Sequence, residues 1–370
     1  MVLVAKVNKG NISEVKEKLR DNDNLNNEYR ITTDDTFGYL PLNKKREEEI
    51  NKDNKNLNKN VRRLIIEIKD KRLTKIKKKE SYKSKLKKLL GKNEFSSFDV
   101  IGDICIVRID FELKNKEKEI GQILLSIPNV KTVLKRESKY GGEYRTQKLK
   151  FLAGIRKKET THIESGIRLK LDVEKVYFSI RSSRERLRIA NLVKKREKVL
   201  VMFSGCSPYE LVIGKHSKAK LIVGIEKNPI ANKYAFENMK LNKMNEKSER
   251  IKLFNGDVKE VCSSLKKEKF DRIIMPLPRK AYEYLWDALK VSKKGTKIHL
   301  YMFEKWDDEK SMKKEWQKTL DKYFGNLKIK NIVKAGNYSP NVYRVCFDLE
   351  VTDYKSGEAF EGTVTLISNN

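Results

Sequence analysis

Three apolar segments in the carboxy-terminal half of the chain end in residues that could bind a nucleoside. In VLVMFSGCSPYE, the small residues Ser204 and Gly205 lead into a helical pattern. Small side chains let a ligand approach the backbone, and the start of a helix offers unpaired N–H groups. The next two segments, LIVGIEKNP and KLFNGDVKE, end in Glu226 and Asp257. One carboxylate can accept from both ribose hydroxyls, and the other is placed to accept from the exocyclic amine of adenine.

The three segment ends predict a pocket for S-adenosyl-L-methionine. Carboxyl ends of parallel strands share one edge of a sheet, which is where open α/β sheets bind ligands. The dinucleotide fingerprint GxGxxG is absent, which agrees with a nucleoside cofactor that has no phosphates. Taken singly, Glu226 or Asp257 could equally be an acid that caps a helix. The cofactor-binding residues predicted here are Phe203, Ser204, Gly205, Glu226, Lys227, Asp257, Val258 and Pro276.

A fourth segment, FDRIIMPLPRKAYEYL, ends in the corner Pro276–Leu277–Pro278. Proline cannot donate to a sheet ladder, so these prolines should end the strand and stiffen the loop at its carboxyl edge. We expect this corner to form a rigid apolar wall that contacts the cofactor and the target base.

Short apolar strands that alternate with helices position these segment ends. The alternation follows the helix SSRERLRIANLVKK and predicts a doubly wound, Rossmann-like α/β domain. Before it, FDVIGDICIVRID and VKTVLKRE predict strands that flank a helix, and two strands should meet at Glu164–Gly166. The predicted domains are a small amino-terminal module (1–60), a basic helical linker (61–95), an α+β middle domain (96–175) and the α/β domain (176–370).

The net charge of +32 indicates a polyanionic partner, with nucleic acid first among the candidates. A basic composition shared by a whole lysine-rich proteome is the plainer explanation. The amino terminus lacks the apolar core of a signal peptide, and no apolar run is long enough to span a membrane. We therefore expect a cytoplasmic protein with no membrane contact. Its four cysteines and three histidines are scattered, so we predict neither a metal site nor a disulfide framework.

Several blocks of the sequence resemble the archaeal and eukaryotic tRNA guanosine-37 N1-methyltransferases. The blocks are GGEYRTQKLKFLAG, THIESGIRLKLDVEKVYFSIRSSRERLRIA, EKNPIANKYAFENMKLNK and DRIIMPLPRKA, in the family's order and spacing. The resemblance covers nearly the whole chain, including an amino-terminal module like the family's tRNA-recognising one. It implies a class I methyltransferase domain, S-adenosyl-L-methionine as cofactor, tRNA as partner and a monomeric protein.

The resemblance also implies roles for residues outside the strand ends. Arg145 matches the arginine that stabilises charge on guanine O6, and Glu185 matches the proposed general base. Tyr177 and Arg181 match the mouth of the substrate pocket, and Arg186 matches a cofactor-contacting position. Guanine N1 must lose a proton to become a nucleophile, which fits a carboxylate base and a cationic partner for O6. Without the resemblance, Arg181 and Glu185 would be interpreted as a surface ion pair at i,i+4 spacing.

Two positions depart from the family pattern. Many members have Asp at the position of Val201 and Asn at that of Pro276. These variants look most like an archaeal subgroup in which some members also methylate the tricyclic wyosine precursor at C7. Two alternatives stay open: the related aminocarboxypropyl transferase of wyosine synthesis, and a non-catalytic RNA-binding protein with a decayed methyltransferase domain. An exocyclic-amine methyltransferase is disfavoured because its Asn/Asp-Pro-Pro-aromatic loop is missing.

Overall fold

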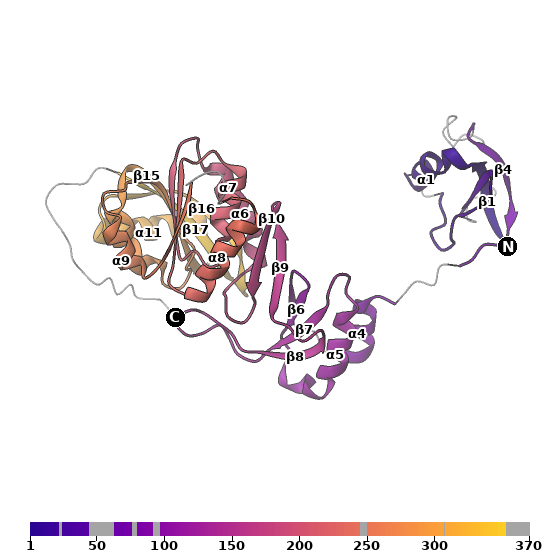
Figure 1. Ribbon diagram of the computed structural model, residues 1–370, viewed down its shortest axis with the longest axis horizontal. Coiled ribbons are helices and arrows are strands. Elements are labelled where there is room, and N and C mark those ends of the chain that lie inside the picture. Colours follow the sequence, from indigo (N-terminus) through magenta and orange to yellow (C-terminus); the bar gives the residue numbers. More distant parts are fainter. Residues whose placement is uncertain are drawn as a thin grey trace. The chain divides into compact units, whose positions relative to one another are not determined.

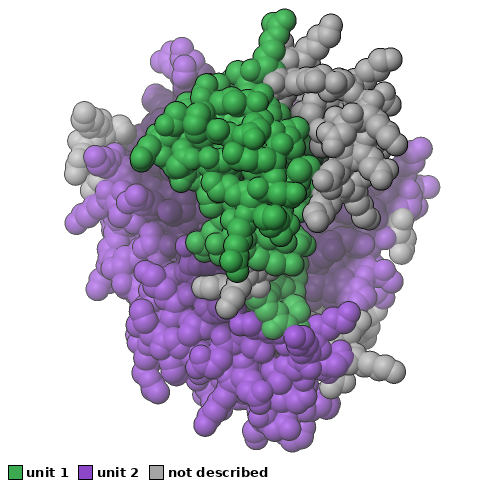
Figure 2. Space-filling view, turned by 90° about the vertical axis from the view of Figure 1, so that its right-hand side faces the viewer, with its two compact units in different colours: residues 1–84 green, residues 85–370 purple. Residues whose placement is uncertain are grey.

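The computed structural model describes residues 1–21, 24–43, 63–75, 80–91, 97–244, 250–306 and 308–352. The chain forms two compact units, residues 1–84 and 85–370, and the boundary falls within helix α4 (Tyr82–Leu90). Figure 2 shows the two units in different colours. The predicted boundaries near residues 60 and 95 lie outside the described residues.

Unit 1 contains a four-stranded sheet of order β2-β3-β1-β4 with one α-helix (Figure 1). Its elements are β1 (Val2–Asn8), α1 (Ile12–Asp21), β2 (Thr32–Thr33), β3 (Phe37–Pro41) and β4 (Ile65–Lys71). Apolar residues of β1 and β3 pack against Val15 and Leu19 of α1, and these two side chains are fully buried.

The prediction of a helical linker over 61–95 was wrong for residues 65–71. This segment is strand β4, which pairs antiparallel with β1 from Val2↔Lys71 to Val7↔Ile65. Ile65 and Ile68 pack against the core of unit 1. The charged residues Glu67, Lys69, Asp70 and Lys71 mask the apolar face in the sequence, but β-branched residues favour a strand on a half-buried sheet. The basic helix of this region is α4, farther along the chain.

Unit 2 begins with a small α+β layer. Its four-stranded sheet has the order β5-β6-β7-β8, and β9 and β10 form a separate antiparallel hairpin that turns at Ser165–Gly166. The elements are β5 (Phe98–Ile101), β6 (Ile104–Val107), α5 (Glu117–Leu125), β7 (Thr132–Arg136), β8 (Leu149–Gly154), β9 (Glu159–Glu164) and β10 (Ile167–Asp172).

The rest of unit 2 is a seven-stranded sheet of order β13-β12-β11-β14-β15-β17-β16. The strands are β11 (Lys198–Met202), β12 (Leu221–Glu226), β13 (Ile251–Asn255), β14 (Phe270–Met275), β15 (Ser292–Lys305), β16 (Leu327–Ser339) and β17 (Val342–Val351). β11 to β15 are parallel to one another, and β17 runs antiparallel to both of its neighbours. The predicted doubly wound fold is confirmed.

Helices cover both faces of this sheet. The helices are α6 (Ser183–Leu192), α7 (Pro208–His216), α8 (Pro229–Leu241), α9 (Val258–Ser264), α10 (Leu285–Lys290) and α11 (Glu309–Tyr323). Apolar residues of α6, α7 and α8 share one core cluster with one face, and those of α9, α10 and α11 share the other. Strands buried on both faces explain why their sequences are continuous apolar runs.

Two asparagines, Asn238 in α8 and Asn242 directly after it, attach the β9–β10 hairpin to the large domain. The Asn238 amide accepts from the N–H of Lys170 (2.6 Å) and donates to its carbonyl (3.0 Å). Asn242 makes the same pair of bonds with Arg168, at 2.8 and 2.7 Å. These bonds cover the free edge of β10 and fix the chain that leads from it to the candidate site. Among the described residues, no helix combines the length and the apolar character needed to cross a membrane.

Candidate active site

The turn after β11 adopts an unusual backbone conformation. Phe203, Gly205 and Ser207 all have positive φ, at 62°, 60° and 63°. Such angles in residues with a side chain are uncommon and concentrate at functional sites. The turn ends at α7, which has Pro208 in its first turn. Beneath it, the hydroxyl of Ser204 bonds to the buried carboxylate of Glu210.

Glu226 lies at the end of β12 and accepts hydrogen bonds from this turn. Its carboxylate accepts from the N–H of Gly205 at 2.6 Å and from the N–H of Asn228 at 2.7 Å. Burial raises the pKa of Glu226, although these N–H groups work in the opposite direction. A Cβ placed on Gly205 would have only the carbonyl oxygen of Tyr177 nearby, at 3.7 Å. The strand end is therefore open to a ligand on the side of Gly205.

Asp257 has two roles at the end of the next strand. Its carboxylate caps α9 by accepting from the N–H of Lys259 (2.9 Å), and it pairs with Lys227 at 3.0 Å. Burial works to raise the pKa of Asp257, but these two partners lower it overall. Lys227 also reaches Glu143, at 2.5 Å, from the loop after β7. The helix-capping alternative is thus correct for Asp257, and the pairing with Lys227 still places it beside Glu226.

The proline corner lies at the carboxyl end of β14, the strand that pairs with β11. β14 ends at Met275, directly before Pro276, as predicted. The N–H of Leu277 bonds to the Met275 carbonyl at 2.9 Å, which makes the corner tight. Leu277, Phe203 and Tyr284 pack against the same core cluster, and the rings of the last two are 5.0 Å apart. Pro278 and Val258 are both buried.

Arg145 and Tyr177 lie together although they are distant in sequence. The Arg145 guanidinium lies 4.3 Å from the centre of the Tyr177 ring, which also contacts the Tyr140 ring at 4.9 Å. Arg145 has a φ of 51°, and no carboxylate pairs with it among the described residues. The ion pair of Glu143 with Lys227 joins this loop to the strand ends. An unpaired cation beside an aromatic ring can stabilise an oxygen that develops negative charge.

Glu185 is buried on α6, and its partners come from the helix itself and from β15. Its Oε1 accepts from the hydroxyl of Tyr301 (2.6 Å) and from Arg188 Nη2 (2.7 Å), and its Oε2 accepts from Arg188 Nε at 2.8 Å. The i,i+4 pair of Glu185 with Arg181 is not formed, because Arg181 bonds to Asp99 at 3.0 and 3.1 Å. Among the contacts of the described residues, none joins Glu185 to Arg145.

Arg186 makes its contacts in the protein interior. Its guanidinium forms two bonds of 2.6 Å with the carboxylate of Glu164, at the end of β9, and donates to the Ser179 carbonyl at 3.0 Å. Both side chains are only 3% exposed. Arg186 therefore links the hairpin to the segment that carries Tyr177 and Arg181.

Sequence reasoning missed a polar network behind Glu185. Arg188 also bonds to Asp348 (2.9 Å), Asp348 bonds to His299 (2.6 Å), and His299 bonds to Arg272 (2.7 Å). With Cys346, His299 and Asp348 have the spacing of a metal-binding group. Two guanidiniums already contact these atoms, which makes the cluster an ion-pair network rather than a cation site. A histidine and an aspartate inside apolar strands were the available signal, since buried charges need partners.

Three family models match successive parts of the chain between residues 6 and 332. The TRM5/TYW2 methyltransferase domain matches residues 160–332, the TYW2 N-terminal domain matches 79–158, and the tRNA methyltransferase 5 N-terminal domain matches 6–50.

Two relatives are named tRNA (guanine(37)-N(1))-methyltransferase Trm5b. The chain is 40% identical to that of Pyrococcus abyssi over 70% of its own length and 75% of the relative. It is 34% identical to that of Methanocaldococcus jannaschii over 95% of its length and 99% of the relative. A relative from Nanoarchaeum equitans, tRNA (guanine(37)-N(1))/4-demethylwyosine(37)-methyltransferase Taw22, is 34% identical over 56% of this chain and 84% of its own.

Solved structures are similar as well. The complex of aTrm5 with tRNALeu has a TM-score of 0.71 and 32% identity, covering 95% of this chain and 100% of that one. A structure of TYW2 from M. jannaschii in complex with AdoMet has a TM-score of 0.51 and 27% identity, covering 69% of this chain and 100% of that one.

Proposed function

This chain belongs to the TRM5/TYW2 family of S-adenosylmethionine-dependent methyltransferases, and we propose that it methylates N1 of guanosine-37 in tRNA. The resemblance seen in the sequence is confirmed by relatives that match nearly the full chain. The observation that carries the proposal is the convergence of Arg145, Tyr177, Glu226 and Asp257 through the Glu143–Lys227 ion pair. A cationic substrate loop and a nucleoside-binding strand edge are thereby held side by side.

The residues at the strand ends fit S-adenosyl-L-methionine. Glu226 keeps acceptor positions beyond its two N–H bonds, which suit ribose hydroxyls. The left-handed turn at Gly205 leaves room for a close approach to the backbone, and Phe203, Val258 and Leu277 offer apolar surface for the adenine ring. The bound cofactor supplies an electrophilic methyl group.

In the proposed reaction, Arg145 stabilises negative charge on guanine O6 while Glu185 accepts the N1 proton. A carboxylate has about four acceptor positions. Tyr301 and Arg188 use three of those on Glu185, which leaves one on Oε2 for the incoming proton. Guanosine-37 would be rotated out of the anticodon loop to reach the site. Tyr177 and Arg181 stand at the entrance, and Arg186 positions the segment that carries both.

Unit 1, residues 1–84, is proposed as the tRNA-recognition module, because β4 belongs to its sheet. The match of residues 6–50 to the tRNA methyltransferase 5 N-terminal domain supports this assignment. Lysine contacts to phosphate would add affinity and salt dependence without sequence choice.

Methyl transfer to a tRNA transcript with guanosine at 37, followed by nucleoside mass spectrometry, tests the proposal. We expect N1-methylguanosine, which should be lost with adenosine at 37 and fall by about two orders of magnitude or more with Glu185→Ala, since general base catalysis contributes ~10²–10⁴. A mass gain of an amino-acid-bearing group would instead establish the aminocarboxypropyl transferase. Tight tRNA binding without any transfer would favour the RNA-binding alternative.

A second activity, C7-methylation of the wyosine precursor, is favoured by Pro276. At this position Asn would offer an amide to guanine, whereas proline offers only its carbonyl and leaves the corner apolar. The bifunctional relative from N. equitans supports the proposal. We expect methylation of a tRNA bearing the tricyclic base, and we expect Pro276→Asn to reduce it relative to guanosine-37 methylation. Equal activities in the variant and the parent protein would contradict this reasoning.

A further inference from the structure

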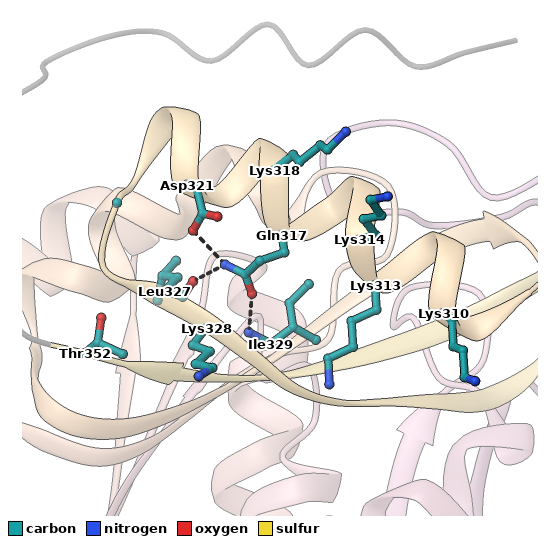
Figure 3. A pocket seen from close by; sticks show the side chains of 11 residues that line it. Lys310, Lys313, Lys314, Gln317, Lys318, Asp321, Leu327, Lys328, Ile329 and Thr352 are labelled. Carbon is teal, nitrogen blue, oxygen red and sulfur yellow. Dashed lines mark hydrogen bonds between the residues drawn. The ribbon is translucent and has the colours of Figure 1, made fainter.

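A lysine-rich groove lies between α11 and the edge strand β16, on the face of the sheet that α9, α10 and α11 cover (Figure 3). Its volume is about 740 Å³. Five exposed lysines line it, together with the apolar side chains of Leu327 and Ile329. The lysines are Lys310, Lys313, Lys314, Lys318 and Lys328.

A polar anchor fixes the floor of the groove. The Gln317 side chain donates to the carbonyl of Leu327 (2.8 Å) and accepts from the N–H of Ile329 (2.8 Å), so it bonds the helix to the backbone of the edge strand. Asp321, the acidic residue of the lining, accepts a bond from Gln317 at 2.8 Å. The helix and strand are thus held at a fixed separation. In Figure 3, Lys314 and Lys318 extend upward from α11, whereas Lys310, Lys313 and Lys328 extend toward the lower part of the view.

The charges of the groove are not balanced by acids. Within the described residues, no carboxylate forms an ion pair with Lys314, Lys318 or Lys328. Lys310, Lys314 and Lys318 are spaced four residues apart along α11, where like charges destabilise a helix by ~0.2–0.5 kcal/mol per pair. A solvated helix face gains stability when acids alternate with lysines at this spacing. The repulsive arrangement indicates an anionic partner that neutralises it.

The length of the row formed by Lys310, Lys314 and Lys318 favours a polymer over a small anion. From Lys310 to Lys318 the helix rises about 12 Å at ~1.5 Å per residue. α11 begins after the carboxyl end of β15, on the edge of the sheet that holds the candidate active site. α11 ends near Leu327–Ile329 at the start of β16. These residues pair with the part of β17 that also pairs with the first part of β15. A nucleic acid strand carries a phosphate every ~3.4 Å of axis, so the row can face several consecutive phosphates.

We propose that this groove binds the phosphate backbone of the tRNA substrate while guanosine-37 occupies the active site. This inference rests on the proposed function only for the identity of the RNA. The lysines provide affinity and orientation, and base recognition remains with the active site.

Binding of a labelled tRNA transcript by the full-length protein, measured by fluorescence anisotropy between about 50 and 200 mM salt, tests the groove. The variant is Lys314→Gln/Lys318→Gln/Lys328→Gln. Its matched control is Lys233→Gln/Lys240→Gln/Lys243→Gln, which removes the same charge from exposed lysines at α8, on the other face of the sheet. We expect the salt slope of log Kd to fall by about 2 to 3 in the groove variant, at ~0.7–0.9 per lost phosphate contact. We expect a change below about 1 in the control.

Equal affinities and slopes in the groove variant and the control would overturn the proposal. The rate of methyl transfer at saturating tRNA should stay at the parent value in the groove variant, because these lysines do not contact the reacting atoms. The binding assay does not depend on methyl transfer. If the parent protein binds tRNA through the groove but transfers no methyl group, the proposed function is refuted and the groove proposal stands.

Discussion

Replacing Arg186 by methionine tests whether this residue contacts the cofactor or positions the substrate segment. The substitution keeps an apolar stem but removes both 2.6 Å bonds to Glu164 and the bond to the Ser179 carbonyl. Removing one partner of a buried ion pair leaves an uncompensated charge and costs about 3–5 kcal/mol. With both side chains 3% exposed, solvent cannot replace the lost guanidinium. We expect Arg186→Met to lower the free energy of unfolding by that amount.

The double variant Arg186→Met/Glu164→Leu supplies the matched control. Replacing both members of a buried pair by apolar side chains is often neutral or stabilising. We therefore expect the double variant to regain most of the stability, because the hairpin again packs against α6. Intrinsic tryptophan fluorescence during urea unfolding is a suitable assay, since Trp286, Trp306 and Trp316 all belong to unit 2.

Kinetics separate the two roles of Arg186. If it positions Tyr177 and Arg181 through Ser179, the single variant loses stability and turnover together. The double variant then recovers the stability but not the turnover, because the bond to the Ser179 carbonyl stays lost. A single variant with parental stability but a raised KM for S-adenosyl-L-methionine, unrelieved by Glu164→Leu, would refute the positioning role. It would show a direct contact with the cofactor instead.

Three further outcomes are expected. Tyr301→Phe removes the 2.6 Å donor to Glu185, and we expect single-turnover methyl transfer to slow about tenfold, or ~1.4 kcal/mol, with unchanged tRNA binding; a parental rate would contradict the positioning role. Burial raises the pKa of Glu210 from 4.5 to about 8, so the folded protein keeps a proton that the unfolded chain releases. The free energy of unfolding should therefore fall by up to ~1.4 kcal/mol per pH unit between about pH 4.5 and about pH 8. The urea midpoint of Glu210→Gln should not show this dependence on pH. Gly224→Ala would place a Cβ 2.3 Å from Glu210 Oε1 and 2.9 Å from Ser204 Oγ. We therefore expect the free energy of unfolding to fall by ~1–3 kcal/mol. An unchanged urea midpoint would count against this packing.

The positions of Glu226 and Asp257 at neighbouring strand ends could be predicted from the sequence, because the apolar pattern of the strands also indicates the topology of the sheet. Continuous apolar strands imply a parallel sheet, and a parallel sheet brings its carboxyl ends to one edge. The structure places Glu226 and Asp257 at adjacent strand ends, as expected. It also shows that capping and ligand binding are compatible for Asp257, since one carboxylate caps α9 and still pairs with Lys227.

Contacts between distant segments could not be predicted in this way. The pair of Glu143 with Lys227 and the network from Glu185 to His299 each join elements that are separated by many residues. Periodicity reports which face of an element is buried but not which buried side chain it meets. Strand β4 was missed for a related reason, because its charged residues suggested a solvated helix and its pairing with β1 depends on tertiary structure.

The structure also explains how the turn after β11 tolerates Val201. In parallel register Val201 pairs with Gly224, so the side-chain positions of both residues point to the same face of the sheet. The Glu210 carboxylate lies over this pair, as its 2.3 Å distance from a Cβ built on Gly224 shows. Where many family members carry an aspartate on the strand, this chain brings a carboxylate to the same face from α7 and holds it with the hydroxyl of Ser204. An acid at 201 would have to be buried beside Glu210, and valine avoids the cost of burying a second polar group there. The chain therefore has a buried acid beneath the turn although residue 201 is valine, and Val201 by itself does not indicate a decayed cofactor site.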